Sequence, residues 1–515
     1  MNMHTQLSAG RRIVATSLTL GALLLSAGCA NKGVVHNSKL DREAAEIVIT
    51  LDGDMRDWPG VTAATADEHH LYTRFKVEGE IYTLQSDPNP TAILIDADAN
   101  ASTGYKVEPT GELSSLGVDL VVEFSPTRSD GQAGRGVVLF AMSNDGTRTP
   151  LSVYDWDFSF APTYASEWYE ARISRTPNGS VPASIPQEGL LTKGDVTGAF
   201  VRYDSQGKIV AASDLFRTTA GPRCMDVARK SNLEVPPKEP GVLRVVSYNV
   251  LFSSPTKKPE PFTRIFKALD PDVILVQEWE AASNRELAEW FNTNLMREGG
   301  WDVVAAAGKV SEGKGVAIIT KHPAKTVEND LHISASAAPE LANDRVRFAL
   351  ASIEMPKATL LAASTHLKSR GSAGSPEDMK RIAEAAAINT ALREVASAQK
   401  PAFMFIGGDM NLVGSYTPLE TLAAGADLDG SDLAIATPRT LGDRTSVTWS
   451  ENGNEFSPGR LDYILYSDSK AGIIRSFVLD TARLSEQSLM ASGLEAGDSA
   501  AASDHMPVVV DFMLK

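Results

Sequence analysis

The chain has 515 residues, several times the usual length of one domain, so we expect more than one domain. Hydrophobic residues make up 43% and charged residues 22% of the sequence, which excludes a wholly disordered protein. The 65 acidic residues outnumber the 49 Lys and Arg, and the net charge of −16 argues against a broad basic surface for polyanions. Two cysteines exclude a disulfide-rich scaffold and a multi-cysteine metal site.

Residues 11–29 have the order of a signal peptide: Arg11 and Arg12, a short apolar stretch, and small residues before Cys29. The ending LLSAGC resembles the lipobox of bacterial lipoproteins. This resemblance implies that residues 1–28 are removed and that Cys29 is lipidated. It places the protein in the bacterial cell envelope, held at the membrane by its lipid anchor alone. A plain secretory signal with a secreted product is the alternative.

A proline-rich stretch divides the rest of the chain. Pro236, Pro237 and Pro240 fix the backbone and withhold hydrogen-bond donors, which predicts a linker over residues 218–240. Before it, residues 41–217 contain short apolar runs separated by turn clusters, which predicts an antiparallel β-sandwich domain. After it, residues 241–515 alternate apolar strands with helical stretches, the pattern of an α/β domain. The predicted fold class is therefore α/β with an N-terminal β-sandwich.

Two helices of the second half show clear start signals. Ser283 precedes Glu286 at the spacing of a capping box. Ser375 is followed by Pro376 at the first helical position, and an Ala-rich helix is predicted from there to about Ala398.

Six segments of the second half join an apolar strand to polar residues at its end. Strand ends are where the sheets of α/β proteins bind ligands, because the interior of the sheet stays apolar. Each segment alone is explained equally well by a turn or a structural hydrogen bond. Their joint occurrence points to one site. The segments are VVSYNV (245–250), DVILVQEWE (272–280), LLAASTHLKSRG (360–371), FMFIGGDMNL (403–412), PGRLDYILY (458–466) and ASDHMPVVVDF (502–512).

This ordered set resembles the endonuclease/exonuclease/phosphatase superfamily, the fold of DNase I, over about residues 241–515. The resemblance implies a four-layer α/β/β/α sandwich with its site at one edge of the sheets. Met410 stands where the family commonly has Phe. The resemblance further implies that Glu278, Asn249 and Asp504 hold a divalent cation. Oxygen ligands of this kind suit Mg²⁺ or Mn²⁺.

The resemblance also implies the residues that act on the substrate. His505 is expected to be the general base, with Asp462 orienting its imidazole. Asp409 is expected to position the attacking water or to protonate the leaving oxygen. Asn411 and His366 are expected to donate hydrogen bonds to the phosphate oxygens.

Four basic residues are candidates for contact with an anionic substrate. Lys368 and Arg370 follow His366, and a solvated loop explains them equally well. Arg345 and Arg347 alternate along a predicted strand, so we expect both on one face as phosphate contacts.

The first half resembles family 9 carbohydrate-binding modules in TLDGDMRDWPG (50–60), LIDADANASTGY (94–105) and WYEARISR (168–175). The resemblance implies a glycan as a partner, although the tryptophans are equally expected in the core. Asp96, Asp98 and Asn100 place three oxygen side chains on one tight loop and predict a Ca²⁺ site. A hydrogen-bonded Asx turn without metal is the alternative.

The predicted function is an exported, metal-dependent phosphoesterase of the phosphodiesterase or nuclease type. A phospholipid or small phosphate-ester hydrolase on the same fold is one alternative. A surface binding protein without activity is another, although a decayed site has no physical reason to keep all its polar residues. The loops around the predicted site contain no motif that identifies the substrate. DNA, RNA, lipid and small phosphate esters are therefore all candidate substrates.

Overall fold

The computed structural model describes residues 49–515 apart from 78–80, 108–110, 127–133, 179–181, 183–184, 186–189, 225–229, 280–282, 307–314 and 337. The predicted signal peptide and Cys29 lie outside the described residues. Among the residues that are described, no helix is both long enough and apolar enough to cross a membrane.

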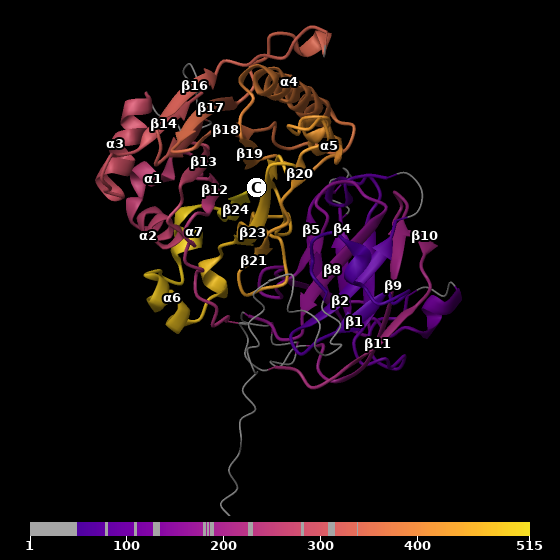
Figure 1. Ribbon diagram of the computed structural model, residues 1–515. Coiled ribbons are helices and arrows are strands. Elements are labelled where there is room, and N and C mark those ends of the chain that lie inside the picture. The colour runs from indigo at the N-terminus through magenta and orange to yellow at the C-terminus, as the bar shows by residue number, and fades with distance from the viewer. Residues whose placement is uncertain are drawn as a thin grey trace, which may run out of the picture. The chain divides into compact units, whose positions relative to one another are not determined.

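The N-terminal half consists of two antiparallel sheets (Figure 1). The first sheet has the order β1 (Ala64–Ala66), β2 (His70–Lys76), β8 (Trp168–Ser174), β7 (Ser159–Ala161). The second runs β10 (Ile209–Ala212), β9 (Gly194–Tyr203), β3 (Thr91–Asp96), β4 (Leu120–Phe124), β5 (Val137–Met142), β6 (Arg148–Leu151), with β11 (Phe216–Ala220) also paired to β9. Buried side chains from both sheets, among them Phe75 and Phe124, form one shared core. This is the packing of a β-sandwich.

The C-terminal half also contains two sheets, and these mix parallel and antiparallel pairs. The first has the order β14 (Asp302–Ala305), β15 (Val316–Thr320), β13 (Val273–Gln277), β12 (Leu243–Asn249), β24 (Val508–Leu514), β23 (Ala471–Val478), β21 (Arg439–Thr440). The second has the order β16 (Ala324–Glu328), β17 (Phe348–Met355), β18 (Ala358–His366), β19 (Phe403–Asp409), β22 (Asp462–Tyr466), β20 (Ala434–Ile435). Strands β12 and β13 are parallel, as are β18 and β19.

The helices of this half are α1 (Ser254–Lys257), α2 (Pro259–Leu269), α3 (Asn284–Asn294), α4 (Pro376–Gln399), α5 (Thr417–Ala423), α6 (Glu486–Ser492) and α7 (Asp498–Ala502). The described residues of the two halves also form short 3-10 helices, η1 (Met55–Asp57), η2 (Leu84–Ser86), η3 (Gly111–Ser115), η4 (Pro339–Leu341) and η5 (Thr481–Arg483). The two predicted helix starts are confirmed. Ser283 caps α3 by accepting the N–H of Glu286, and Ser375 caps α4 by accepting that of Asp378.

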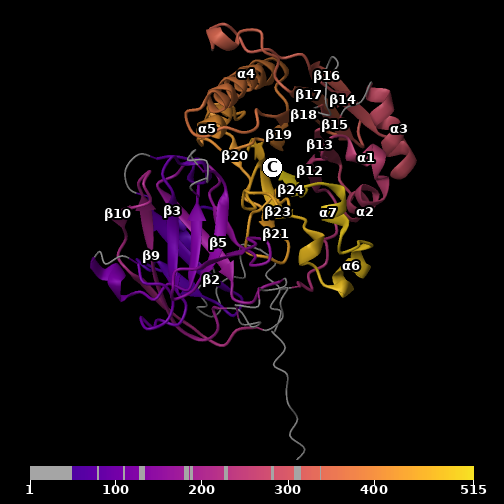
Figure 2. The ribbon, with the colours of Figure 1, turned by 180° about the vertical axis from the view of Figure 1, so that it is seen from behind.

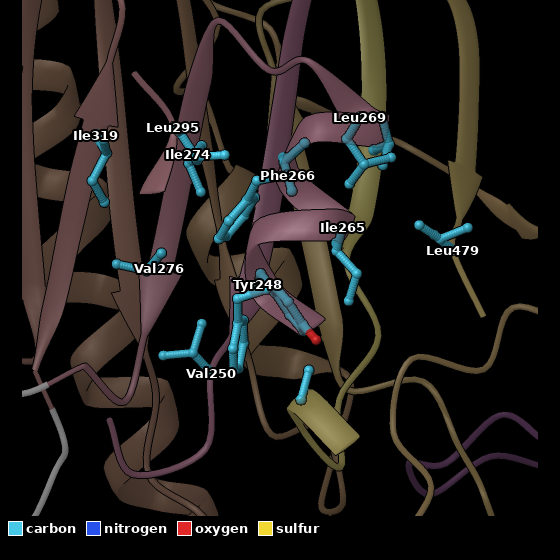
Figure 3. Close-up of a cluster of buried hydrophobic side chains, with 14 of the residues drawn as sticks. Tyr248, Val250, Ile265, Phe266, Leu269, Ile274, Val276, Leu295, Ile319 and Leu479 are labelled. Carbon is cyan, nitrogen blue, oxygen red and sulfur yellow. The ribbon is translucent and has the colours of Figure 1, made fainter. Parts of the chain in front are cut away.

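Three apolar layers hold the C-terminal half together. The two sheets pack face to face through strand residues such as Leu275 and Phe405. Helices α2 and α3 cover the outer face of the first sheet, where Phe266 lies against Ile274 and Val276 (Figure 3). Helices α4 and α5 cover the outer face of the second sheet (Figure 2). The predicted four-layer α/β/β/α sandwich is therefore confirmed, while the predicted domain boundaries stay a prediction.

Candidate active site

Three of the predicted site residues lie in one row across the second sheet of the C-terminal half. His366 ends β18 in register with Asp409, which ends β19. Asp409 is in turn in register with Asp462, which begins the antiparallel strand β22. Since all three strands meet the same edge of the sheet, their polar side chains are brought together there.

The facing sheet contributes Asn249 and Glu278. Asn249 ends β12 in register with Gln277, and Glu278 directly follows β13. Glu278 has a left-handed backbone with φ of 60°, a conformation that is unfavourable for a residue with a side chain. The backbone N–H of Phe252 donates to Glu278 Oε2 at 3.2 Å. Burial raises the pKa of Glu278, although a hydrogen bond to Asn249 acts in the opposite direction.

Asp409 is the centre around which the other groups gather. Its Oδ2 accepts a hydrogen bond from Asn249 Nδ2 at 3.1 Å and lies 3.4 Å from His366 Nε2 and 3.7 Å from His505 Nε2. Its Oδ1 accepts the backbone N–H of Asn411 at 3.0 Å. Burial raises the pKa of Asp409 to about 7, even though the charge of His505 opposes this. The carboxyl group can therefore hold or release a proton near neutral pH.

His505 and Asp462 form a buried pair, with 2.8 Å between Nδ1 and Oδ2. Burial lowers the pKa of His505, but the charges of Asp462 and Asp409 outweigh it and raise the pKa to about 10. A cation beside these carboxylates acts in the opposite direction on His505, since positive charge disfavours the imidazolium. Thr448 holds this end of β22 in place, because its hydroxyl oxygen accepts the backbone N–H of Leu461 and of Asp462.

Arg347 contacts His366 on the side of the imidazole ring that carries Nδ1. Its Nη1 is 3.0 Å from His366 Nδ1, and its Nη2 donates to the carbonyl oxygen of Leu367. A guanidinium group can only donate, so Nδ1 of His366 must be the acceptor. The proton of the neutral imidazole is then on Nε2, directed at Asp409. Arg345 contacts Asp330 and the carbonyl oxygen of Asn329.

Asp504 is held by a residue that the sequence did not single out. The indole Nε1 of Trp449 donates to Asp504 Oδ2 at 3.0 Å. Next to it, the Ser503 hydroxyl donates to the carbonyl oxygen of Asn249 at 2.8 Å and so ties this loop to the end of β12. No motif marks Trp449, since it stands in a long loop and meets Asp504 only in the folded chain.

The remaining predicted residues lie next to this cluster. Asn411 donates from Nδ2 to the carbonyl oxygen of Leu367 at 3.2 Å and is buried. Lys368 donates from Nζ to the carbonyl oxygen of Ser369, and Arg370 is exposed. Phosphate contact by Lys368, Arg370, Arg345 and Arg347 stays a prediction.

The side chains around Glu278 fit a divalent cation. Glu278, Asn249 and Asp504 offer oxygen atoms, the ligands that Mg²⁺ and Mn²⁺ prefer. The charge of Asp504 acts on Glu278, and that of Glu278 acts on Asp409, while His505 and Arg347 offset part of this negative charge. A bound cation would add further positive charge beside Glu278 and Asp504.

In the N-terminal half, a third carboxylate lies close to two residues of the predicted calcium loop. The carboxylates of Asp96, Asp98 and Asp119 have oxygen atoms within 4.8 Å of one another. Asn100 Oδ1 accepts the backbone N–H of Ser102 at 3.0 Å. Burial raises the pKa of Asp119 to about 6. Calcium binding by Asp96, Asp98 and Asn100 stays a prediction, as does glycan binding; Trp58 and Trp156 are buried.

A four-layer fold whose sheet edge gathers carboxylates, histidines and amides belongs to the class of DNase I-like phosphoester hydrolases. Residues 246–505 match the Endonuclease/Exonuclease/phosphatase family, and this match spans half of the chain. The chain belongs to that family. All three activities in the family's name hydrolyse phosphoester bonds. No curated protein matches the chain.

Several solved structures are similar to about half of the chain. The catalytic domain of human nocturnin has 19% identity, with 54% of this chain and 97% of that chain covered and a TM-score of 0.36. ANGEL2, a 2′,3′-cyclic phosphatase, has 15% identity, with 53% and 96% covered and a TM-score of 0.38. The 3′ phosphatase NExo from Neisseria has 17% identity, with 52% and 99% covered and a TM-score of 0.36.

Proposed function

We propose that this chain is an exported, metal-dependent phosphodiesterase that hydrolyses its substrate by in-line attack of water. The observation that supports the proposal best is the set of contacts around Asp409. Asn249, His366 and His505 each lie within 3.1–3.7 Å of its Oδ2, although they come from three separate segments of the chain. Phosphoester hydrolysis needs positioning and charge neutralisation more than a nucleophilic side chain.

In this proposal the His505–Asp462 pair removes the proton from water. Asp462 holds Nδ1 of His505, which leaves Nε2 facing the site as the atom that accepts the proton. Asp409, with its raised pKa, positions the water or gives a proton to the leaving oxygen. His366 and Asn411 donate hydrogen bonds to the phosphate oxygens. Arg347 supports His366 as such a donor, because it fixes the tautomer with the proton on Nε2.

Glu278, Asn249 and Asp504 would hold the cation, Mg²⁺ or Mn²⁺. When bound, the cation neutralises charge on the phosphoryl oxygens. The backbone N–H of Phe252 and the indole of Trp449 keep the two carboxylates aimed at this position.

A phosphodiester of a nucleic acid is the first substrate to test, and a phospholipid or a small phosphate ester is the alternative. The net negative charge of the chain argues against binding of long DNA over a broad surface. It does not oppose hydrolysis at one phosphate, because the cation supplies the local positive charge.

The test is a panel of plasmid DNA, single-stranded DNA, RNA, sphingomyelin and bis-p-nitrophenyl phosphate, each with Mg²⁺, Mn²⁺ or EDTA. We expect EDTA-sensitive hydrolysis of at least one phosphodiester. No EDTA-sensitive turnover of any member contradicts the proposal and favours the binding protein without activity.

We also propose that the protein is anchored in the cell envelope by a lipid on Cys29. The basis is the signal-peptide order of residues 11–29. Mass spectrometry of the protein from membranes tests this: an acylated N-terminal cysteine is expected, whereas an unmodified chain in the medium contradicts it.

A further inference from the structure

Thr163 belongs to the N-terminal half, where it follows β7, but its hydroxyl contacts the C-terminal half. Oγ1 lies 2.9 Å from the carbonyl oxygen of Leu412 and 3.0 Å from that of Arg460. Thr163 is only 7% exposed, so water does not compete for these bonds. A hydroxyl has one proton, which here is shared between two carbonyl groups.

The two carbonyl groups lie just beyond the end of a strand pair in the active site. Strands β19 and β22 pair up to Asp409 and Asp462, and Met410 N–H then donates to the carbonyl oxygen of Leu461 at 2.9 Å. The backbone pairing ends there. Beyond it, the Thr163 hydroxyl bonds to both the segment after β19 (410–414) and the segment before β22 (456–461), which are the two segments meant below. Asn411 precedes one of these carbonyl groups directly, and Asp462 follows the other by two residues.

The approach of Thr163 depends on a glycine. A Cβ atom at Gly459 would lie 2.3 Å from Thr163 Cγ2, so a larger residue there would push the threonine away. Gly459 therefore lets the hydroxyl reach both segments.

Other residues of the N-terminal half hold the same two segments further from the catalytic side chains. The backbone N–H of Ala165 donates to the carbonyl oxygen of Gly414 at 2.7 Å, and the Thr83 hydroxyl donates to that of Val413 at 2.9 Å. On the second segment, the Tyr154 hydroxyl donates to the carbonyl oxygen of Phe456 at 3.0 Å. Thr163 differs from these contacts because it alone in this set touches both segments.

We propose that Thr163 is a positioning residue of the active site, contributed by the N-terminal half. It fixes the spacing between Asn411, which carries a phosphate donor, and Asp462, which orients the base His505. The inference rests on the proposed phosphoesterase function. It gives the N-terminal sandwich a role in catalysis that does not depend on any ligand of its own.

The test is Thr163→Val, which keeps the shape of the side chain and removes the hydroxyl, compared with Thr163→Ser, which keeps the hydroxyl. With bis-p-nitrophenyl phosphate and Mg²⁺, we expect Thr163→Val to lower kcat about tenfold with little change in KM, because misplaced groups slow chemistry more than binding. Thr163→Ser should retain most of the parent kcat. If Thr163→Val does not fold, Thr163→Ala against Thr163→Ser makes the same comparison.

Tyr154→Phe is the matched control, because it also removes one hydrogen bond between the two halves. We expect it to lower the melting temperature to a similar extent and to keep the parent kcat. A parent-like kcat in Thr163→Val, a failure of Thr163→Ser to retain activity, or an equal loss in Tyr154→Phe would overturn the inference.

A second readout needs no turnover. The low-field proton resonance of His505 Nδ1–H should move in Thr163→Val and stay in place in Tyr154→Phe. An unmoved resonance in Thr163→Val overturns the positioning role. A parent protein that hydrolyses nothing, but whose resonance moves as expected, overturns the proposed function and leaves the geometric claim supported.

Discussion

Nδ1 of His505 lies 2.8 Å from Oδ2 of Asp462, although 43 residues separate the two in the chain. Both side chains are buried, and Nε2 on the other side of the imidazole lies 3.7 Å from Asp409. An ionised carboxylate can only accept a hydrogen bond, so the proton between them is on Nδ1. Asp462 thereby selects the ring orientation and tautomer in which Nε2 faces the site.

Changing Asp462 to Asn should disable this pair without removing the histidine. Oδ1 of Asp462 has no hydrogen-bond partner among the described residues, so neither orientation of the amide pairs all of its groups. We expect kcat to fall by about 10² or more, since the tautomer of the base is no longer fixed. We also expect the pKa of His505 in the metal-free protein to fall, because Asp462 is the main charge that raises it. Kinetics and an NMR titration of His505 check both; a parental kcat would contradict the assigned pair.

Glu278→Gln should weaken the metal site while the fold stays intact. The substitution removes one negative charge from the predicted ligands, and hard divalent cations bind charged oxygens most strongly. We expect the Mg²⁺ concentration for half-maximal activity to rise by about tenfold or more, within the range seen when metal sites are perturbed. Glu289→Gln, on the exposed face of α3, is the control and should behave as the parent. An unchanged Mg²⁺ dependence in Glu278→Gln would remove Glu278 from the metal site.

Asp443→Asn should destabilise the contact between the two halves. Arg172 is buried and donates to both carboxylate oxygens of Asp443, at 2.6 and 2.8 Å. Arg172 would keep only Asp157 at 2.9 Å, a carboxylate that Arg483 also contacts. Because a buried arginine would lose one of its two anionic partners, we expect the free energy of unfolding to fall by up to about 3 kcal/mol at neutral pH. Urea denaturation measures this, with Asp429→Asn at an exposed turn as the control.

The loss of stability caused by Asp443→Asn should depend on pH. Burial raises the pKa of Asp443, but Arg172 and Arg483 outweigh it and hold the pKa well below its usual value of 3.8. Because the pKa of Asp443 is lower in the folded chain than in the unfolded chain, the carboxylate stabilises the fold at pH values above its unfolded pKa. This stabilisation is lost as the pH falls towards the folded pKa. The difference between parent and Asp443→Asn should therefore shrink as the pH falls below about 4. A difference that stays constant down to acid pH would show that Asp443 acts through its shape alone.

The sequence predicted those features that depend on local pattern. The residues around Ser283 and Ser375 predicted where α3 and α4 begin, because an N-cap side chain bonds to the first turn of its own helix. Apolar runs ending in Asn249, Glu278, His366 and Asp409 predicted that these residues meet in one site, because strand ends converge in this type of fold.

Other features depend on contacts that no local pattern encodes. The contact between Arg347 and His366 was not predicted, because 19 residues separate the two in the sequence. Trp449, Asp119 and Thr163 come from loops or from the other half, and their partners are set by how distant segments pack. Their roles follow from the folded chain alone.

The most direct test of the proposed mechanism compares the parent with His505→Ala on the phosphodiester that the panel identifies, with Mg²⁺ and with EDTA. General-base catalysis contributes about 10²–10⁴ in rate, so we predict a loss of that size in kcat while substrate binding changes little. The melting temperature should fall, because the buried Asp462 carboxylate loses its partner, so activity is compared at a temperature where both proteins are folded. We further predict that EDTA abolishes turnover by the parent. Parental activity in a folded His505→Ala protein would contradict the account.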